Sequence, residues 1–269
     1  MINFKLKDTK SYKPVGSSTG LSMSWYWLTE GDLWIDLGDS SLYEYSPKAQ
    51  EYFGGLKSQY NEYQIIRFIE DFTALFEVIS ESIPNDIYRL AENSAKFLQD
   101  AQKWLDLNDA EEDQQDDFYF EKYDKLISWI NRRSLDSGHL VGGPKLSFFR
   151  NKDKIRVTWQ ADYKLENGID LWTAGEGSIE FSYSEFINDV KDFGDRFFKQ
   201  MQEQVDLAVE KEWNGIQIDK QRLLAEHSER EIDFWKQFKL LKGKSPSETK
   251  WELIRELKSQ MDEEIKRKA

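Results

Sequence analysis

The residues best suited to chemistry form one acidic run, DLNDAEEDQQDDFYFEKYD, over residues 106–124. It holds nine acidic residues and a single lysine. Two interpretations stay open: a solvated loop that begins a helix, whose N-terminus favours anions, or an acidic docking surface for a basic partner. Interfaces favour tyrosine anchors, so the docking interpretation includes the nearby tyrosines. Its predicted partner-binding residues are Asp109, Glu111, Glu112, Asp113, Asp116, Asp117, Tyr119 and Tyr123.

Four further carboxylates lie within WYWLTEGDLWIDLGD, residues 25–39. A glycosidase or metal site would need two of them to face each other, with one desolvated. The TEGD segment instead predicts a hairpin turn between aromatic strands. Alternation after this turn places Leu33, Ile35 and Leu37 on one face and Asp36 on the other. We therefore expect a hairpin core and not a catalytic cleft, with the acids at turns and on the wet face: Glu30, Asp32, Asp36 and Asp39.

Other sources of chemistry are few. The chain has no cysteine, which excludes disulfides and thiolate metal sites. Its two histidines, His139 and His227, lie far apart and outside known catalytic signatures. We expect His227 on a helix surface or boundary and His139 near a helix-to-strand turn. No GxGxxG or GxxxxGK[ST] motif occurs, and GGPK and GEGS are expected to be tight turns. The sequence thus predicts no cofactor and no metal.

Charge narrows the class of partner. The formal net charge is −13, and charged residues make up 32% of the chain. Such a protein repels nucleic-acid phosphate and anionic lipid and attracts a basic protein or a cationic ligand. The first residues lack the apolar core of a signal peptide, and no stretch approaches the roughly 18 apolar residues of a membrane span. We expect a soluble cytoplasmic protein without nucleic-acid or membrane partners.

Periodicity predicts an α+β fold, in which antiparallel meander sheets pack with several amphipathic helices and a helical C-terminal extension follows. The first meander comprises SMSWYWL, LWIDLG and SLYEYS; the second comprises KLSFFR, KIRVTWQ, IDLWTA and SIEFSYS. Helical period marks residues 64–80, 85–105 and 117–133, and a capping box at Ser182–Glu185 begins another helix. Two last helices are expected, from about Asp219 to Leu241 and from an N-cap at Ser245.

The expected organisation has three parts: a polar lead-in over residues 1–20, an α+β domain over 21–214 and a C-terminal helical extension over 215–269. LKGKSPS has the composition of a linker, so the final helix is expected to pack loosely or to dock on a partner. Whether the two meanders form one sheet stays open, as does the oligomeric state.

Three segments resemble an uncharacterised bacterial domain family. Its members have a WLTDG-x-YWI-like opening, an R-x-x-ED helix and an LD-x-G-x-L-x-x-GP segment before a strand. In this chain, Glu30 stands where aspartate is usual, and an extra residue separates the glycine from the aromatic pair. The resemblance covers roughly residues 21–210. The matching residues are Trp27, Leu28, Thr29, Glu30, Gly31, Trp34, Ile35, Arg67, Glu70, Asp71, Leu135, Asp136, Gly138, Leu140, Gly143 and Pro144.

Members of that family look like immunity proteins that neutralise toxins in bacterial competition, or like parts of other defence loci. The resemblance carries over no catalytic residue. With the charge, it predicts an immunity-type inhibitor that binds and neutralises a basic toxin or effector protein through an acidic surface. The alternative is an uncharacterised enzyme or a scaffold subunit of a bacterial defence system. The enzyme would need Asp36 or Glu70 to converge with Arg67 and His139 in a pocket, whereas the scaffold would dock its final helix.

Overall fold

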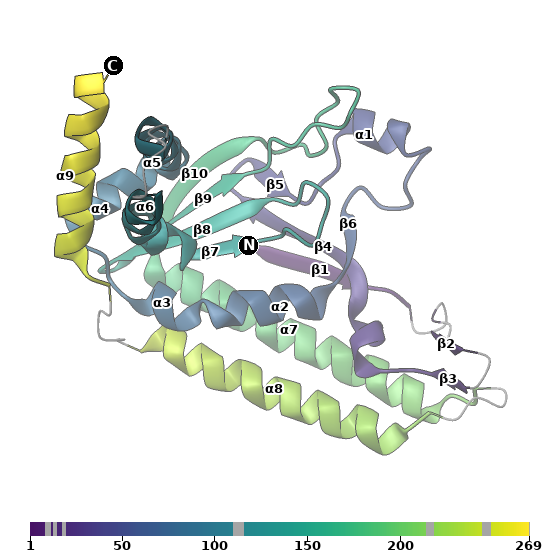
Figure 1. The fold of residues 1–269 in the computed structure, drawn as a ribbon. Coiled ribbons are helices and arrows are strands. Elements are labelled where there is room, and N and C mark those ends of the chain that lie inside the picture. Colours follow the sequence, from purple (N-terminus) through teal and green to yellow (C-terminus); the bar gives the residue numbers. More distant parts are fainter. Residues whose placement is uncertain are drawn as a thin grey trace.

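The computed structural model describes residues 1–8, 12, 15–17, 20–109, 116–213, 218–243 and 249–268. Two antiparallel sheets lie next to each other, with long helices against one face and further helices at one side (Figure 1). This arrangement confirms the predicted α+β class. The first sheet consists of β1 (Ile2–Leu6), β4 (Glu30–Leu37), β5 (Ser40–Leu42) and β6 (Asn61–Gln64). The second consists of β7 (Ser134–Asp136), β8 (Lys145–Asn151), β9 (Lys154–Gln160) and β10 (Glu176–Ser182).

The first strand comes from the segment expected to be a polar lead-in. Ile2 and Phe4 are buried, and β1 pairs with β4 so that Phe4 lies opposite Leu33. Burial of these two side chains ties residues 2–6 into the sheet, although neighbouring lysines make the segment polar on average. Two further short strands, β2 (Val15–Ser17) and β3 (Gly20–Ser22), pair with each other.

The hairpin predicted at the opening segment is wrong in its first half. Residues Trp25–Thr29 form a short 3-10 helix, η2, because Trp25 and Leu28 turn inward and are fully buried. The TEGD segment is the start of β4 and not a turn. A Cβ at Gly31 would lie 2.3 Å from the Lys5 carbonyl oxygen, so glycine here permits close strand approach.

The predicted faces of β4 are confirmed. Leu33, Ile35 and Leu37 are buried, whereas Asp36 on the opposite face is exposed. A turn with Gly38 in the left-handed region (φ +62°) then leads into β5, as the GDS segment indicated.

The meanders form two sheets and not one. They are joined through a loop over residues 161–175, in which the Ser46 amide donates to the Leu171 carbonyl (3.0 Å) and the Thr173 amide to the Glu44 carbonyl (2.9 Å). The strand predicted at IDLWTA lies in this loop and is therefore wrong. The second sheet still has four strands, because the short β7 takes the edge position beside β8.

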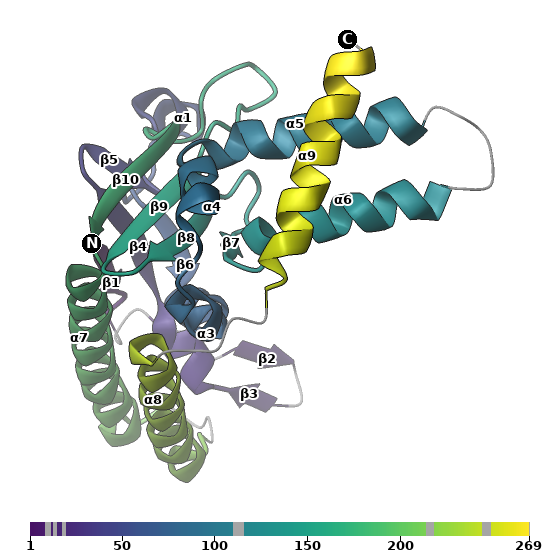
Figure 2. The same cartoon turned by 90° about the vertical axis from the view of Figure 1, so that its left-hand side faces the viewer.

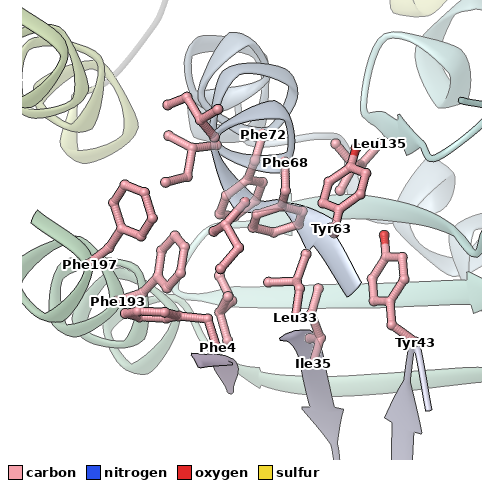
Figure 3. Packing of buried hydrophobic residues seen from close by; sticks show 14 of the residues in the cluster. Phe4, Leu33, Ile35, Tyr43, Tyr63, Phe68, Phe72, Leu135, Phe193 and Phe197 are labelled. Carbon is pink, nitrogen blue, oxygen red and sulfur yellow. The ribbon is translucent and has the colours of Figure 1, made fainter. Parts of the chain in front are cut away.

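Long helices cover the inner face of both sheets. Phe4, Phe68, Phe72, Phe193 and Phe197 gather between strands and helices in one aromatic core (Figure 3). The capping box at Ser182 is confirmed, as is the apolar stripe of the helix that follows it. The body of the molecule is defined here as the two sheets with α2 (Ile65–Ala74), α3 (Phe76–Ser80), α7 (Tyr183–Glu210) and α8 (Lys220–Lys242). A short helix, α1 (Pro47–Tyr52), follows β5.

The remaining helices form an arm that projects from the second sheet (Figure 2). It is defined here as α5 (Ser94–Asp109), α6 (Asp116–Asn131) and α9 (Trp251–Lys268), and α4 (Asn85–Leu90) with the 3-10 helix η3 (Ala91–Asn93) leads into it. The final helix does not pack loosely: Ile254, Leu257 and Met261 are at most 5% exposed and face α5 and α6. The predicted cap Ser245 lies outside the described residues.

The last two helices thus belong to different parts of the molecule. Helix α8 lies along α7 in the body, whereas α9 completes the arm. The residues predicted as one C-terminal extension therefore do not stand apart from the rest of the fold.

Candidate functional site

The arm has its own hydrophobic core, built around two tryptophans. Trp104 of α5 and Trp129 of α6 are both fully buried. The Trp104 indole donates to a Glu264 carboxylate oxygen of α9 (2.7 Å), so α5 and α9 are joined by a directional contact as well as by apolar packing. On the other side of the arm core, Trp129 packs against Phe97 and against Phe149 of β8. The arm is therefore a rigid element seated on the second sheet.

A buried ion pair fixes the base of the arm. Arg133, just after α6, is fully buried and pairs with Glu81, which follows α3. Glu81 also accepts hydrogen bonds from Thr249 Oγ1 (2.9 Å) and Trp251 Nε1 (3.2 Å) at the start of α9. Burial lowers the pKa of Arg133 to about 10, with Glu81 acting in the opposite sense. One carboxylate thus connects the body, α6 and α9.

The far end of the arm presents two bare aromatic rings. Phe118 and Phe120, in the first turns of α6, are 53% and 58% exposed. Residues two positions apart on a helix point in different directions, so the two rings lie on either side of Tyr119 at this end of the arm. Lys122 lies 4.2 Å from the ring centroid of Phe118, so a cation–π contact holds that ring in place.

The two predicted tyrosines lie beside this surface and turn partly inward. Tyr119 packs edge-on against Trp104, and the Tyr123 hydroxyl donates to Gln102 Oε1 (3.1 Å). Both side chains are half-buried. The exposed rings, Phe118 and Phe120, were missed, although the helical period that turns Tyr119 and Tyr123 inward leaves these two positions off the buried stripe.

The predicted acidic residues bracket the same end of the arm. Asp109 ends α5, and Asp116 and Asp117 begin α6; their side chains are outside the described set. Glu111, Glu112 and Asp113 lie outside the described residues altogether.

Three acidic residues whose side chains are described also lie at this end of the arm, and two of them raise the pKa of Tyr123. Asp106, Glu121 and Asp124 are exposed there. Burial raises the pKa of Tyr123, and the charges of Asp106 and Asp124 raise it further. These contacts indicate a negative potential around the exposed phenylalanines.

The constellation that an enzyme was predicted to use does not form in the described residues. Asp36 accepts hydrogen bonds from Asn3 and Ser41 on the outer face of the first sheet. Glu70 pairs with Arg230 of α8 (2.5 Å), and Arg67 is hydrogen-bonded to the Tyr26 hydroxyl. His139 stacks on Tyr63, on the core-facing side of β6. In the sheet, Tyr63 lies opposite Gly31 of β4. Asp36 lies about 16 Å further along β4, and its side chain points to the opposite face of the sheet from Tyr63.

His227 is a core residue and not the surface or boundary residue that was expected. It is 3% exposed, and the Trp25 indole donates to its Nδ1 atom (3.2 Å). Burial lowers the pKa of His227. The interaction joins η2 to α8 and holds the histidine in its neutral form, which is a structural role.

The loop after β7 contacts the first sheet through a buried hydrogen bond. The buried Tyr43 hydroxyl lies 2.5 Å from Ser137 Oγ. The pKa of Tyr43 is raised to about 12, chiefly by burial and also by Asp71 and Asp136, although the hydrogen bond with Ser137 acts in the opposite direction. Figure 3 shows Tyr43 and Tyr63 on the same side of the strands, near Leu135. Ser137, which lies within the LD-x-G segment, thus connects this loop to the first sheet.

Neither a metal cluster nor a membrane span is found in the described part of the chain. Its histidine, aspartate and glutamate residues form no group of three that could hold a metal ion. Among the described helices, none is both long enough and apolar enough to cross a bilayer.

Comparison with known proteins gives one match. A family model described as a family of unknown function (DUF5984) matches residues 1–257, which include α8 and the first turns of α9. No curated protein and no solved structure matches the chain.

Proposed function

The chain belongs to DUF5984, a family of unknown function, and we propose that it is an immunity-type inhibitor that binds a basic toxin or effector protein with the end of its arm. The observation that carries the proposal is the pair Phe118 and Phe120, exposed beside an acid-rich segment on a rigid helical support. Hot spots of protein interfaces are aromatic residues surrounded by a polar rim. The phenylalanines supply the anchors, and the acids supply the rim.

The charge of this end selects the partner. Nine acidic residues stand within 106–124 against one lysine, and the lysine is already engaged over the Phe118 ring. A basic surface would be steered toward it by the long-range field, which raises the association rate. Desolvation of the phenylalanines would then slow dissociation.

The arm also suits an inhibitor because its anchors need little ordering. Phe118 lies one residue from Tyr119, which packs on Trp104, and Phe120 contacts the ring of Tyr123. Residues presented by a preformed helix lose less conformational entropy on binding than residues of a mobile loop. An inhibitor that occludes an active site gains affinity from such preorganisation.

The test uses a double variant in which the anchors are removed. The partner to be tried is the product of a neighbouring gene that encodes a basic effector, and its binding and activity are measured with the wild-type chain and with Phe118→Ala/Phe120→Ala. Each hot-spot aromatic contributes about 2 kcal/mol or more, so we expect binding to weaken by at least a hundredfold and the effector to regain activity. The matched control is Tyr52→Ala/Phe53→Ala, which removes two other exposed aromatics (54% and 44%) at the C-terminal end of α1.

Charge reversal tests the steering part of the proposal. Changing the acids of the run to lysine should lower the association rate more than it changes the dissociation rate, and raising salt should do the same to the wild type. Equal binding by the phenylalanine double variant and the wild type would remove the arm end from the interface. The residues to be reversed are Asp109, Glu111, Glu112, Asp113, Asp116 and Asp117.

A further inference from the structure

The outer face of the second sheet carries rungs of directly opposed side chains across β8, β9 and β10, and three of them follow one another from Phe149 to Lys145. The registers align Phe149, Arg156 and Glu180 in the first rung, Ser147, Thr158 and Ser178 in the second, and Lys145, Gln160 and Glu176 in the third. Opposed residues of antiparallel strands point to the same side, so each rung lines the face that α4, η3 and α5 cover.

In the first rung, both charged side chains have hydrogen-bond partners. Arg156 donates to Glu180 (3.1 Å) and to the Tyr88 carbonyl (3.0 Å), and Glu180 also accepts from Lys154 (2.6 Å) and from the Tyr88 hydroxyl (2.8 Å). Tyr88 of α4 closes over this rung, with its ring 4.6 Å from the Arg156 guanidinium. Charges at this end of the sheet therefore satisfy one another.

The third rung differs, because its charges have no partner. Among the described residues, none forms a hydrogen bond or ion pair with the side chains of Lys145, Gln160 or Glu176. Lys145 lies on β8 and Glu176 on β10, with the neutral Gln160 of β9 between them. Their backbones are therefore about 10 Å apart. A cavity of about 210 Å³ lies over this rung and the second one, and Glu92 and Leu98 are part of its lining.

The walls of this cavity are rich in hydroxyl groups. Ser147 and Thr158 are buried at its floor, where Ser94, the first residue of α5, approaches Thr158 Oγ1 to 3.1 Å. Ser178 and Glu176 are exposed on the edge strand β10, so the cavity opens there. Its volume is sufficient for several water molecules or for a ligand of a few heavy atoms.

From this arrangement we propose that the cavity binds a small polar α-amino acid, with its carboxylate on Lys145, its ammonium group on Glu176 and its side chain toward the Ser147–Thr158 hydroxyls. The charge of the walls supports this choice over an anion. Glu92 is paired with Arg156 (3.9 Å), so the unpaired charges of the lining are Lys145 and Glu176. A zwitterion offers each of these two an opposite charge, whereas a phosphate would be repelled by Glu176. Gln160, between them, can donate to and accept from the same ligand.

The site is separate from the arm end that the proposed function uses. Helix α5 begins at the cavity and runs 16 residues to Asp109, a length of about 24 Å. Binding of an amino acid can therefore be measured on the full chain without any protein partner, and failure of either proposal leaves the other standing.

Calorimetric titration with L-serine tests the site, because serine carries both charges and a hydroxyl side chain. Ethanolamine lacks its carboxylate and lactate lacks its ammonium group, so we expect both to bind at least about tenfold more weakly than serine. Lys145→Gln should weaken serine by a similar factor and leave ethanolamine unaffected. Glu176→Gln should weaken serine and leave lactate unaffected.

Lys154→Gln is the matched control, since it removes a lysine from the same face that is paired with Glu180, next to the first rung, and it should bind serine as the wild type does. Thermal unfolding of each variant confirms that the sheet is intact. Lack of serine binding at millimolar concentration would overturn the proposal, as would equal affinities for serine, ethanolamine and lactate. Serine affinity unchanged in both charge variants would also overturn it.

Discussion

The body and the arm are stabilised in different ways. In the body, aromatic and aliphatic side chains from both sheets meet α2, α3, α7 and α8. In the arm, buried charges accompany the apolar core: of the described aspartate, glutamate, lysine and arginine residues, the three that are buried are Glu81, Arg133 and Glu264. All three lie in the arm or at its base.

The difference shows how each part acquires its orientation. Apolar burial is non-directional, and a large core tolerates several packings. A buried carboxylate with several donors allows few geometries, because an unsatisfied charge in the interior is costly. Glu264 illustrates the point: burial would raise its pKa, but hydrogen bonds from Gln260 and Trp104 together with Lys122 and Arg267 lower it. We infer that polar contacts set the angle at which the arm leaves the body.

The largest effect is expected when the base of the arm is broken. Arg133→Ala leaves Glu81 buried without its cation, and removal of one partner of a buried ion pair costs about 3–5 kcal/mol. Urea unfolding should show this loss, together with a second transition if the arm separates from the body first.

The same pair can be neutralised rather than broken. In Glu81→Gln/Arg133→Met no buried charge remains, and glutamine can still accept from Thr249 and Trp251. This double variant should be clearly more stable than Arg133→Ala. Equal stability of the two would show that lost packing, and not an uncompensated charge, determines the effect.

A smaller loss is expected where two body helices approach closely. A Cβ at Gly194 of α7 would lie 2.2 Å from the Phe234 ring of α8. Gly194→Ala should therefore cost about 1–2 kcal/mol, since overpacking outweighs the better helix propensity of alanine. Lys199→Ala, on the exposed side of α7, is the control and should change the free energy of unfolding by less than about 0.5 kcal/mol. The measurement is chemical denaturation followed by circular dichroism.

The same contrast explains which elements could be predicted from sequence. Helix α7 was predictable because Phe186, Val190 and Phe193 repeat at helical spacing after a capping box. The 3-10 helix at Trp25–Thr29 was not, because a short aromatic run is typical of a strand, whereas tertiary contacts of Trp25 with Phe197 and His227 turn it into the core. Short elements depend on tertiary partners that no local pattern contains.

The candidate sites follow the same rule. The acidic run was visible in composition, and helical period could have assigned Phe118 and Phe120 to the exposed side of α6. The unpaired rung of Lys145, Gln160 and Glu176 could not be foreseen, because it depends on the register of strands that lie up to 31 positions apart. Long-range register is set by the packed sheet and not by the neighbours of each residue.

Acid should affect the body through His227. In the folded protein, burial lowers the pKa of His227 below its ordinary value of 6.5, although the charges of Glu231 and Asp206 act in the opposite direction. The unfolded chain therefore binds the proton more readily than the folded chain. The contribution of neutral His227 to the free energy of unfolding is thus present above about pH 6.5 and is lost as pH falls toward the folded pKa. Urea midpoints at pH 7.5 and 5.5 should differ, and His227→Gln, which keeps an acceptor for Trp25, should reduce that difference. An equal difference in the variant would assign the acid sensitivity to other groups.

The smallest effect concerns an exposed contact between α4 and the arm. Arg255 of α9 donates to both carboxylate oxygens of Asp86 (2.6 and 3.0 Å), and this hydrogen bonding lowers the pKa of Asp86 to about 2. Because the folded pKa is below the ordinary value, the contribution is present above about pH 3.8 and fades as pH falls toward 2. Solvent screens the pair, so stability should change little. The direct measurement is the carboxyl carbon shift of Asp86, with a midpoint near 2 in the wild type that rises toward 3.8 in Arg255→Ala. An unchanged midpoint would mean that Arg255 does not hold Asp86 in its ionised form, which would leave the positioning of α9 to its other contacts, among them those of Glu81 and Glu264.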